Sequence, residues 1–426
     1  MKQSLRNHLY VIFSLLIVVG LFTFSMIEGG FVSWFLFYSF LIVALYMLGA
    51  YLYPVHSFEV TRVVSQPTFE AGDTVDIEIR IKRKIPFPLF YAFCEEVLDP
   101  SLQRKDRSNE KFKDLHMDKR LTDTKSYIAL IPMLFRRTLV LKYSIPHIPR
   151  GAHTLHTITL RTSDLFGCIK KSATFSCISD IQVYPRVRPL LYIHDQHSFQ
   201  QDSGPVSTVM RGIQSTLPAG VREYSFGDRM SWIDWKQTAK MNEMMTKEFE
   251  REQDTKVLVV FDHVTYENMN MLAFEGMVET TVAMLHHLTQ KASHADLLSI
   301  GLKIEHMQLD QGEIERGNVA HHFMEVTPER GDSFVRQLEA YGIELRQKAL
   351  TCVISSHITD ETVRVLSNIQ MRTGSTLFIC IMAKDARTPE VNRQLDAMQA
   401  NGISVCVLSE DELSSEPLEV IVHGSN

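Results

Sequence analysis

The sequence predicts a multidomain chain: an N-terminal two-helix transmembrane hairpin, an all-β sandwich-like domain and a C-terminal α/β domain. Residues 9–27 and 31–53 are apolar runs without a charge. Residues 75–81 alternate strictly between apolar and polar side chains, as a half-buried strand does. After residue 256, apolar runs alternate with stretches of helical period, which indicates a mostly parallel sheet. We expect these parts at 1–55, 56–190 and 256–426, with a linker and signature segment at 191–255.

The composition narrows the classes of function. The net charge of −6 gives no sign of a nucleic-acid-binding protein. The six cysteines form no C-x-x-C pair, and three of them lie in apolar runs, which favours buried thiols in a reducing compartment. The glycine-rich nucleotide-binding motifs and the G-x-S-x-G and H-E-x-x-H motifs are absent from the sequence.

The two apolar runs at the N-terminus are each long enough to cross about 30 Å of hydrocarbon. Glu28-Gly29-Gly30 separates them as a tight turn. Lys2 and Arg6 precede the first run, and basic residues follow the second at 62 and 82–84. Positive charge on both outer flanks predicts that both ends face the cytoplasm. We therefore expect a cell-membrane protein with two spans and cytoplasmic soluble domains.

The first soluble domain has the pattern of a small antiparallel sandwich. Alternating runs at 58–64, 75–81, 137–144 and 153–160 are separated by Gly and Pro turns. The stretch 101–125 is highly charged, and we expect it to be a solvated surface loop.

The C-terminal domain opens with residues 256–262, a continuous apolar run ending in Asp262. Such a run is typical of a strand buried on both faces. Residues 271–290 follow with a helical period, and further apolar runs alternate with helical patterns to residue 408. Ligands of such sheets bind beyond the carboxyl ends of the strands, where Asp262 lies.

Residues 220–252 combine many charges with aromatic side chains, including two of the three tryptophans. Because buried charges need partners, we interpret this segment as a partly buried ion-pair network between aromatic side chains. Asp234 is placed to cap a helix that begins at Trp235. The residues to which we assign the structural or partner-binding role are Arg222, Glu223, Tyr224, Gly227, Asp228, Asp234, Trp235, Lys236 and Glu248.

This pattern resembles the signature of the domain-of-unknown-function 58 family. Arg161 to Gly167 and Val183-Tyr184-Pro185 also resemble landmarks of that family, with Leu165 in place of a proline. The resemblance implies a membrane-anchored protein whose α/β domain is a degenerate von Willebrand factor A-like domain. It also implies protein partners, namely a MoxR-type AAA+ ATPase and a transglutaminase-like membrane protein.

In von Willebrand factor A-like domains the equivalent aspartate opens an Asp-x-Ser-x-Ser metal motif. Here Val264 and Tyr266 stand at the serine positions, and Ser355-Ser356-His357 stands where a later acidic ligand is expected. A hard cation such as Mg²⁺ needs several oxygen ligands. We therefore expect no metal and no other cofactor, and we expect Asp262 to accept hydrogen bonds within its loop.

The expected function is that of a non-enzymatic, membrane-tethered scaffold or adaptor with a cytoplasmic protein-docking surface. The resemblance implies a role in complex assembly or envelope maintenance. Two alternatives stay open at this point. One is a hydrolytic enzyme with its site in the cluster at 220–252, and the other is a metal-dependent adhesion domain with Asp262 as a ligand.

Overall fold

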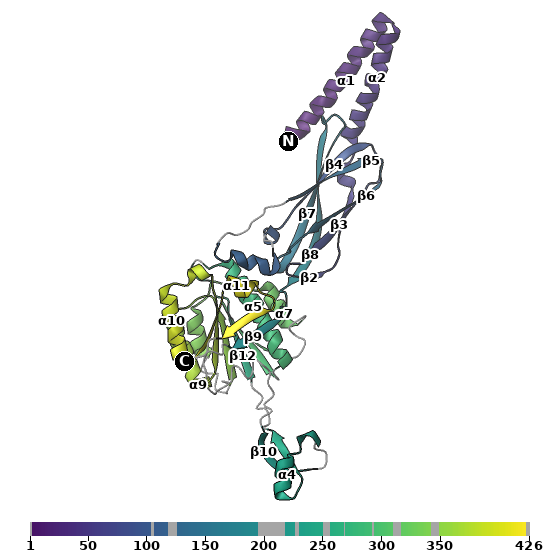
Figure 1. The fold of residues 1–426 in the computed structure, drawn as a ribbon. Coiled ribbons are helices and arrows are strands. Elements are labelled where there is room, and N and C mark those ends of the chain that lie inside the picture. Colours follow the sequence, from purple (N-terminus) through teal and green to yellow (C-terminus); the bar gives the residue numbers. More distant parts are fainter. Residues whose placement is uncertain are drawn as a thin grey trace. The chain divides into compact units, whose positions relative to one another are not determined.

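The structure, a computed structural model, describes residues 2–103, 106–117, 126–194, 218–225, 230–249, 256–267, 269–291, 294–309, 317–341 and 349–422. The chain forms two compact units (Figure 1). Unit 1 comprises Met1–Asp106 and Arg120–Tyr184, and unit 2 comprises Arg107–Lys119 and Pro185–Asn426. The chain therefore passes between the units three times.

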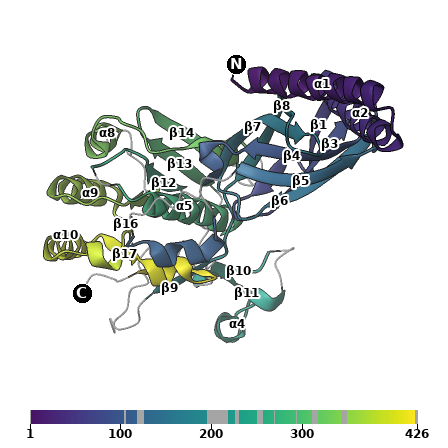
Figure 2. The ribbon, with the colours of Figure 1, turned by 90° about the horizontal axis from the view of Figure 1, so that it is seen from above.

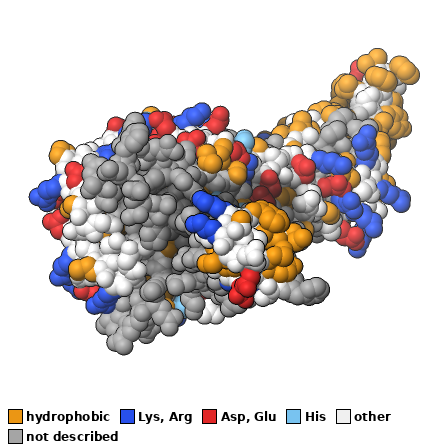
Figure 3. Space-filling view, turned by 60° about the horizontal axis from the view of Figure 1, so that its bottom comes forward, with side chains coloured by type: hydrophobic (Ala, Val, Ile, Leu, Met, Phe, Trp, Pro, Cys, Tyr) orange, Lys and Arg blue, Asp and Glu red, His pale blue; other side chains and the backbone are white. Residues whose placement is uncertain are grey.

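Unit 1 begins with the helices α1 (Lys2–Glu28) and α2 (Phe31–Leu52). Gly29, with φ of 63°, makes the turn between them, as the sequence predicts. Within the described residues, Arg6–Glu28 and Phe31–Leu52 are long and apolar enough to cross a membrane, with mean hydropathies of 2.4 and 2.1. Their exposed side chains are mostly hydrophobic (orange in Figure 3).

The rest of unit 1 is built from two sheets. Within the described residues, β1, β3 and β6 form one sheet, and the other has the order β2-β8-β7-β4-β5. Val75, Ile77, Ile79 and Ile81 of β3 are all buried, because every second side chain of the strand points into the core. The elements are β1 (Glu59–Val64), β2 (Thr68–Glu70), β3 (Val75–Lys82), β4 (Leu89–Val97), β5 (Ser126–Leu134), β6 (Thr138–Ile145), β7 (Gly151–Ser163) and β8 (Lys170–Tyr184), with short 3₁₀ helices η1 (Val55–Ser57) and η2 (Pro100–Gln103).

Unit 2 is organised around a sheet with the order β14-β13-β12-β15-β16-β17 in the described residues. β14 is antiparallel to β13, and the other neighbours are parallel. The strands are β12 (Lys256–Asp262), β13 (His294–Ile300), β14 (Ile304–Leu309), β15 (Ala349–Ser355), β16 (Thr376–Ile381) and β17 (Ser404–Leu408). Beside them, β9 (Leu190–His194) pairs in parallel with β18 (Leu418–Val422).

Both faces of this sheet are covered, and β12 is accordingly apolar throughout its interior, residues 257–261. Val257 and Phe261 join the core with α5, whereas Leu258 and Val260 join the core with α8, α9 and α10. Figure 2 shows α8, α9 and α10 along one side of the sheet. The helices are α5 (Met271–Lys291), α7 (Asn318–Glu325), α8 (Phe334–Tyr341), α9 (Asp360–Thr373), α10 (Pro389–Ala400), α11 (Glu410–Ser414) and the 3₁₀ helix η5 (Lys384–Ala386). The predicted alternation of strands and helices is confirmed.

The segment 107–119, which we call the strap, lies in sequence between two strands of unit 1 but belongs to unit 2. It forms the 3₁₀ helix η3 (Ser108–Asp114). Phe112 and Leu115 are fully buried in the core that contains α5. A side chain at Gly276 of α5 would lie 3.4 Å from the Phe112 ring, so this glycine leaves room for the strap.

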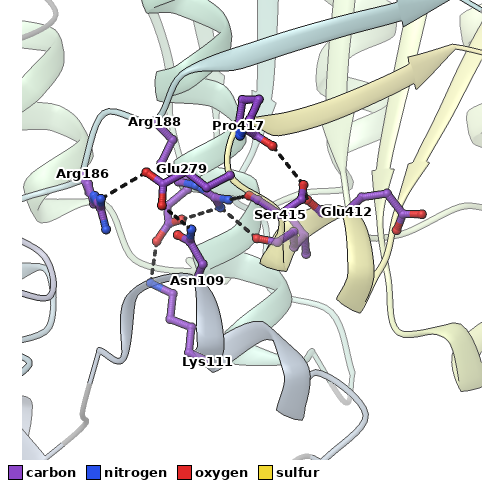
Figure 4. A network of polar contacts seen from close by, with 10 residues as sticks. Asn109, Lys111, Arg186, Arg188, Glu279, Glu412, Ser415 and Pro417 are labelled. Atoms are coloured by element: carbon purple, nitrogen blue, oxygen red, sulfur yellow. Dashed lines mark hydrogen bonds and ion pairs between the residues drawn. The ribbon is translucent and has the colours of Figure 1, made fainter.

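A buried ion-pair network holds the strap against α5 (Figure 4). The Glu279 carboxylate accepts from Lys111 Nζ at 2.5 Å and from an Arg188 guanidinium nitrogen at 3.3 Å. Arg188 also donates to the carbonyl oxygen of Leu413 at 2.9 Å. The prediction of a solvated loop at 101–125 is therefore wrong for the strap: Lys111 is paired in the interior, and Phe112 and Leu115 complete a core.

Candidate functional site

Asp262 ends β12, between β13 and β15, and is fully buried. One carboxylate oxygen, Oδ1, accepts from the Val264 N–H at 3.1 Å. The other, Oδ2, accepts from the Tyr266 hydroxyl at 2.7 Å and the Ser355 hydroxyl at 2.6 Å. The predicted role of Asp262 as a loop hydrogen-bond acceptor is confirmed. Tyr266, which stands at the second serine position of the metal motif, thus supplies a hydroxyl donor to the aspartate.

The surroundings of Asp262 set its ionisation. Burial raises the pKa of Asp262 to about 6, and the hydrogen bonds from Ser355, Tyr266 and Val264 partly oppose that rise. The Tyr266 ring stacks on His357 with centroids 4.2 Å apart, and burial lowers the pKa of this histidine. The residues that the structure describes include no group of three or more His, Cys, Asp or Glu side chains that could hold a metal ion.

Changing Tyr266 to Phe tests this arrangement. With its pKa near 6, Asp262 is ionised at pH 7 and uses the tyrosine hydroxyl as a donor. Removing a hydrogen bond to a buried charge costs about 1.5–3 kcal/mol, so Tyr266→Phe is expected to destabilise unit 2 by that amount at pH 7. The measurement is the opening free energy of β12 amides by native-state hydrogen exchange.

The same variant at pH 5 is its own control. The folded-state pKa of Asp262 lies above its ordinary value of 3.8, so its ionisation opposes folding as pH rises from about 4 to about 6. At pH 5 the carboxyl is mostly protonated and needs fewer donors. The loss caused by Tyr266→Phe should shrink there, and an equal loss at both pH values would contradict the assigned role.

A second polar cluster, which was not predicted from the sequence, lies at the same end of the sheet. The Ser299 hydroxyl is fully buried between His263 Nδ1 at 3.0 Å and His322 Nε2 at 2.9 Å. Glu329 and Glu305 lie 3.7 Å and 3.1 Å from the outer nitrogens of these two imidazoles. Burial lowers the pKa of His263 to about 4.

Gly301 makes room for this cluster. A Cβ added there would lie 1.9 Å from His263 Nε2, so the imidazole fills the space that a side chain would need. Ser299, His263 and His322 come from three different segments, so no spacing motif marks them. The sequence signal was limited to a histidine beside Asp262 and a serine in the next strand.

The signature segment forms a hairpin of its own (Figure 1). β10 (Pro218–Glu223) pairs antiparallel with β11 (Met245–Phe249), and the short helices η4 (Met230–Trp232) and α4 (Trp235–Met241) lie between them in sequence. Asp234 caps α4, as predicted: its Oδ1 accepts from the N–H groups of Lys236 at 3.0 Å and Gln237 at 3.2 Å. Its own N–H donates to Met245 O at 2.9 Å, which fixes the helix on β11.

The hairpin brings most of the signature residues together. Arg222 and Glu223 pair with Thr246 and Met245 across the two strands. Tyr224 follows β10, and its N–H donates to Met244 O at 2.8 Å. Glu248 lies opposite Gly220, although its side chain is outside the described residues. Gly227 and Asp228 also lie outside the described residues.

The two indoles of this hairpin are not enclosed. Trp235 is 67% exposed and Trp232 is 37% exposed, in contrast to the burial that we expected from the sequence. Met230, Met241 and Met244 of the same hairpin are also exposed. The carboxylate of Asp234 is engaged in capping backbone N–H groups. The hairpin therefore presents an apolar surface, which we call the Trp–Met surface, on a short paired scaffold.

Comparisons with known proteins return the same family that the sequence of the hairpin resembles. The profile of the family described as "Protein of unknown function DUF58" matches residues 220–396, from the hairpin through most of the α/β sheet. One relative is the "Uncharacterized protein YeaD" of Bacillus subtilis (strain 168). It is 28% identical over 402 residues, which cover 94% of this chain and 95% of that protein.

Two of the solved structures that match each cover about a third of the chain. The CARDB domain of the PF1109 protein from Pyrococcus furiosus covers 30% of this chain and 92% of its own, at 9% identity and a TM-score of 0.18. The bacterial hydrophobin BslA covers 31% of this chain and 98% of its own, at 14% identity and a TM-score of 0.18. TM-scores this low carry no argument about fold or function.

Proposed function

We propose that this chain is a membrane-tethered, non-enzymatic scaffold of the DUF58 family that presents a protein-docking surface in the cytoplasm. The observation that carries the proposal is the Trp–Met surface. Proteins seldom leave two tryptophans and three methionines exposed on one short hairpin unless these side chains serve an interaction. Trp is enriched among the residues that dominate binding energy, and Met adapts to irregular partner surfaces.

The proposed tether is the α1–α2 hairpin. Both helices are long enough to span a bilayer, and the charge pattern favours cytoplasmic ends. With this orientation, both units would lie in the compartment where the free thiols of the described cysteines stay reduced.

Unit 2 is, in this proposal, a degenerate von Willebrand factor A-like domain. The strand order β14-β13-β12-β15-β16-β17 with an antiparallel edge supports that assignment. So does the position of Asp262 at the carboxyl end of a central strand. The Oδ2 atom of Asp262, which would bind a metal ion in such a motif, already accepts hydrogen bonds from Tyr266 and Ser355. This arrangement favours a docking role over metal-dependent adhesion.

The proposed partner is a MoxR-type AAA+ ATPase, which follows from the family resemblance. The test uses the full-length protein in lipid nanodiscs and the purified MoxR-type ATPase of the same organism. Trp235→Ala is expected to weaken binding by about tenfold or more, as truncation of an aromatic hot spot does. Biolayer interferometry gives the dissociation constant of each variant.

Met371→Ala is the matched control, because Met371 is 77% exposed on α9 of the same unit. It should bind like the unmodified protein. Equal binding by Trp235→Ala and Met371→Ala would contradict the role of the Trp–Met surface. No binding by the unmodified protein would contradict the choice of partner.

A further inference from the structure

We propose that three loops of unit 1 form a second membrane contact that binds anionic lipid headgroups beside the two helices. This inference rests on the proposed membrane span and goes beyond it. The loops are 83–88, 135–137 and 164–170. We call their exposed side chains the basic rim: Lys84, Ile85, Phe135, Arg136, Arg137, Leu165, Phe166 and Lys170.

Helices α1 and α2 are hydrogen-bonded to residues that follow the turn containing Leu165 and Phe166. The Asn7 amide of α1 donates to Lys170 O at 2.7 Å and accepts from Lys170 N–H at 3.3 Å. From the neighbouring position, Lys171 Nζ donates to the carbonyl oxygens of Tyr51 at 2.5 Å and Tyr53 at 2.6 Å, at the end of α2. One short stretch of unit 1 thus holds both helices.

Tyr46 of α2 hydrogen-bonds to two of the loops, 83–88 and 164–170. Its hydroxyl donates to Pro88 O at 3.2 Å and accepts from the Leu165 N–H at 3.2 Å. Tyr46 lies six residues before the end of α2 at Leu52, which is about 9 Å along a helix. If α2 spans the bilayer, these two loops therefore reach the level of its headgroups and upper acyl chains.

The third loop is tied to the first by Arg83, which is buried. The Arg83 N–H donates to Arg137 O at 2.8 Å, and its guanidinium donates to Arg136 O at 2.9 Å and to Phe87 O at 3.0 Å. This network holds the loops 83–88 and 135–137 together. Hydrogen bonds through Arg83 and Tyr46 therefore join the three loops into one edge next to α2.

The side chains that this edge exposes are apolar or basic. Ile85 is 56%, Phe135 63%, Leu165 49% and Phe166 54% exposed. Lys84, Arg136, Arg137 and Lys170 are exposed and form no ion pair with any residue that the structure describes. The acid of these loops, Asp164, is 1% exposed and accepts from the Ile169 N–H at 2.8 Å.

Exposed apolar side chains surrounded by Lys and Arg are suited to binding an anionic membrane surface. Large apolar side chains enter the interface, while Lys and Arg remain at the headgroups and attract negative lipids. The proposed occupant is the bilayer rather than another protein, because the rim continues the apolar surface of α2 through the Tyr46 hydrogen bonds. Its binding would restrict the tilt of unit 1 against the membrane.

The test measures depth by fluorescence quenching in full-length protein. The three native tryptophans are changed to Phe and one reporter is introduced, Phe166→Trp. Nanodiscs contain phosphatidylcholine or phosphatidylglycerol brominated near the top of one acyl chain. Because interfacial side chains lie within reach of these bromines, emission of the Phe166→Trp reporter is expected to fall by about twofold or more.

The control reporter is Ile178→Trp. Ile178 is 69% exposed on β8, eight residues and about 26 Å of strand from Lys170. Its emission should stay unchanged in brominated lipid. Equal quenching at both positions, or none at position 166, would overturn the rim as a membrane contact.

Two further arms separate the possible failures. A chain that keeps only Trp34 of α2 tests the span itself: if Trp34 is not quenched, the proposed tether fails and the rim with it.

At equal mole fraction, brominated phosphatidylglycerol should quench the position-166 reporter about twofold more than brominated phosphatidylcholine, since the cations enrich anionic lipid. Changing Lys84, Arg136 and Arg137 to Gln should abolish this preference. Equal quenching by the two lipids before that change would overturn the headgroup assignment.

Discussion

Replacing Glu279 with Leu is expected to destabilise unit 2 by about 3–5 kcal/mol, the usual cost of removing one partner from a buried ion pair. Lys111 and Arg188 are 4% and 0% exposed, so the change leaves two cations facing an apolar side chain. Their charges cannot be hydrated without opening the core. The measurement is the opening free energy of β12 and β15 amides by hydrogen exchange in the full-length protein.

A double variant separates the charge effect from a loss of packing. Lys111→Met together with Glu279→Leu removes one cation with the carboxylate, and Arg188 keeps its bond to Leu413 O. The double variant should therefore be more stable than Glu279→Leu alone, because an apolar pair can replace a buried ion pair at little cost. Additive losses would contradict a coupled network.

Replacing Phe112 with Ala is expected to cost about 3–5 kcal/mol in the same unit, because it removes a buried ring and leaves a cavity. The ring packs beside Gly276, where Leu413 and Ile381 also approach. The effect should appear in the hydrogen exchange of β12 and α5. Amides of β3 and β7 should keep their protection, because the strap belongs to unit 2.

Met117→Ala provides the comparison within the strap. Met117 lies five residues beyond Phe112 and is 44% exposed, so its truncation should change stability by less than about 0.5 kcal/mol. A large loss at Met117, or loss of protection in β3 on changing Phe112, would contradict the placement of the strap.

Elements with a strong internal pattern were predictable from the sequence. The continuous apolar run of β12 predicted burial on both faces, and the helical period from Met271 predicted α5. Asp234 predicted a helix start because its carboxylate can satisfy free N–H groups. β14 was missed because it is an exposed edge strand in which Glu305, His306 and Gln308 obscure any alternation.

Features made by distant segments were not predictable. The strap contains buried Phe112 and Leu115 three residues apart, but the lysines around them suggested solvent, and their partners lie more than 150 residues away. Ser299 meets His263 and His322 only after the sheet has formed. The tryptophans of the hairpin were expected inside because large aromatics usually are, whereas Trp235 is exposed.

The interleaved course of the chain also bears on how the protein is made and dissected. The ribosome completes the strap long before α5, so the strap cannot pack against α5 until some 170 further residues have been synthesised. A recombinant fragment starting at Pro185 would lack the strap and expose the apolar side chains that Phe112 and Leu115 cover. Co-expression with a peptide covering 106–117 should rescue the solubility of such a truncation, as in split-protein complementation.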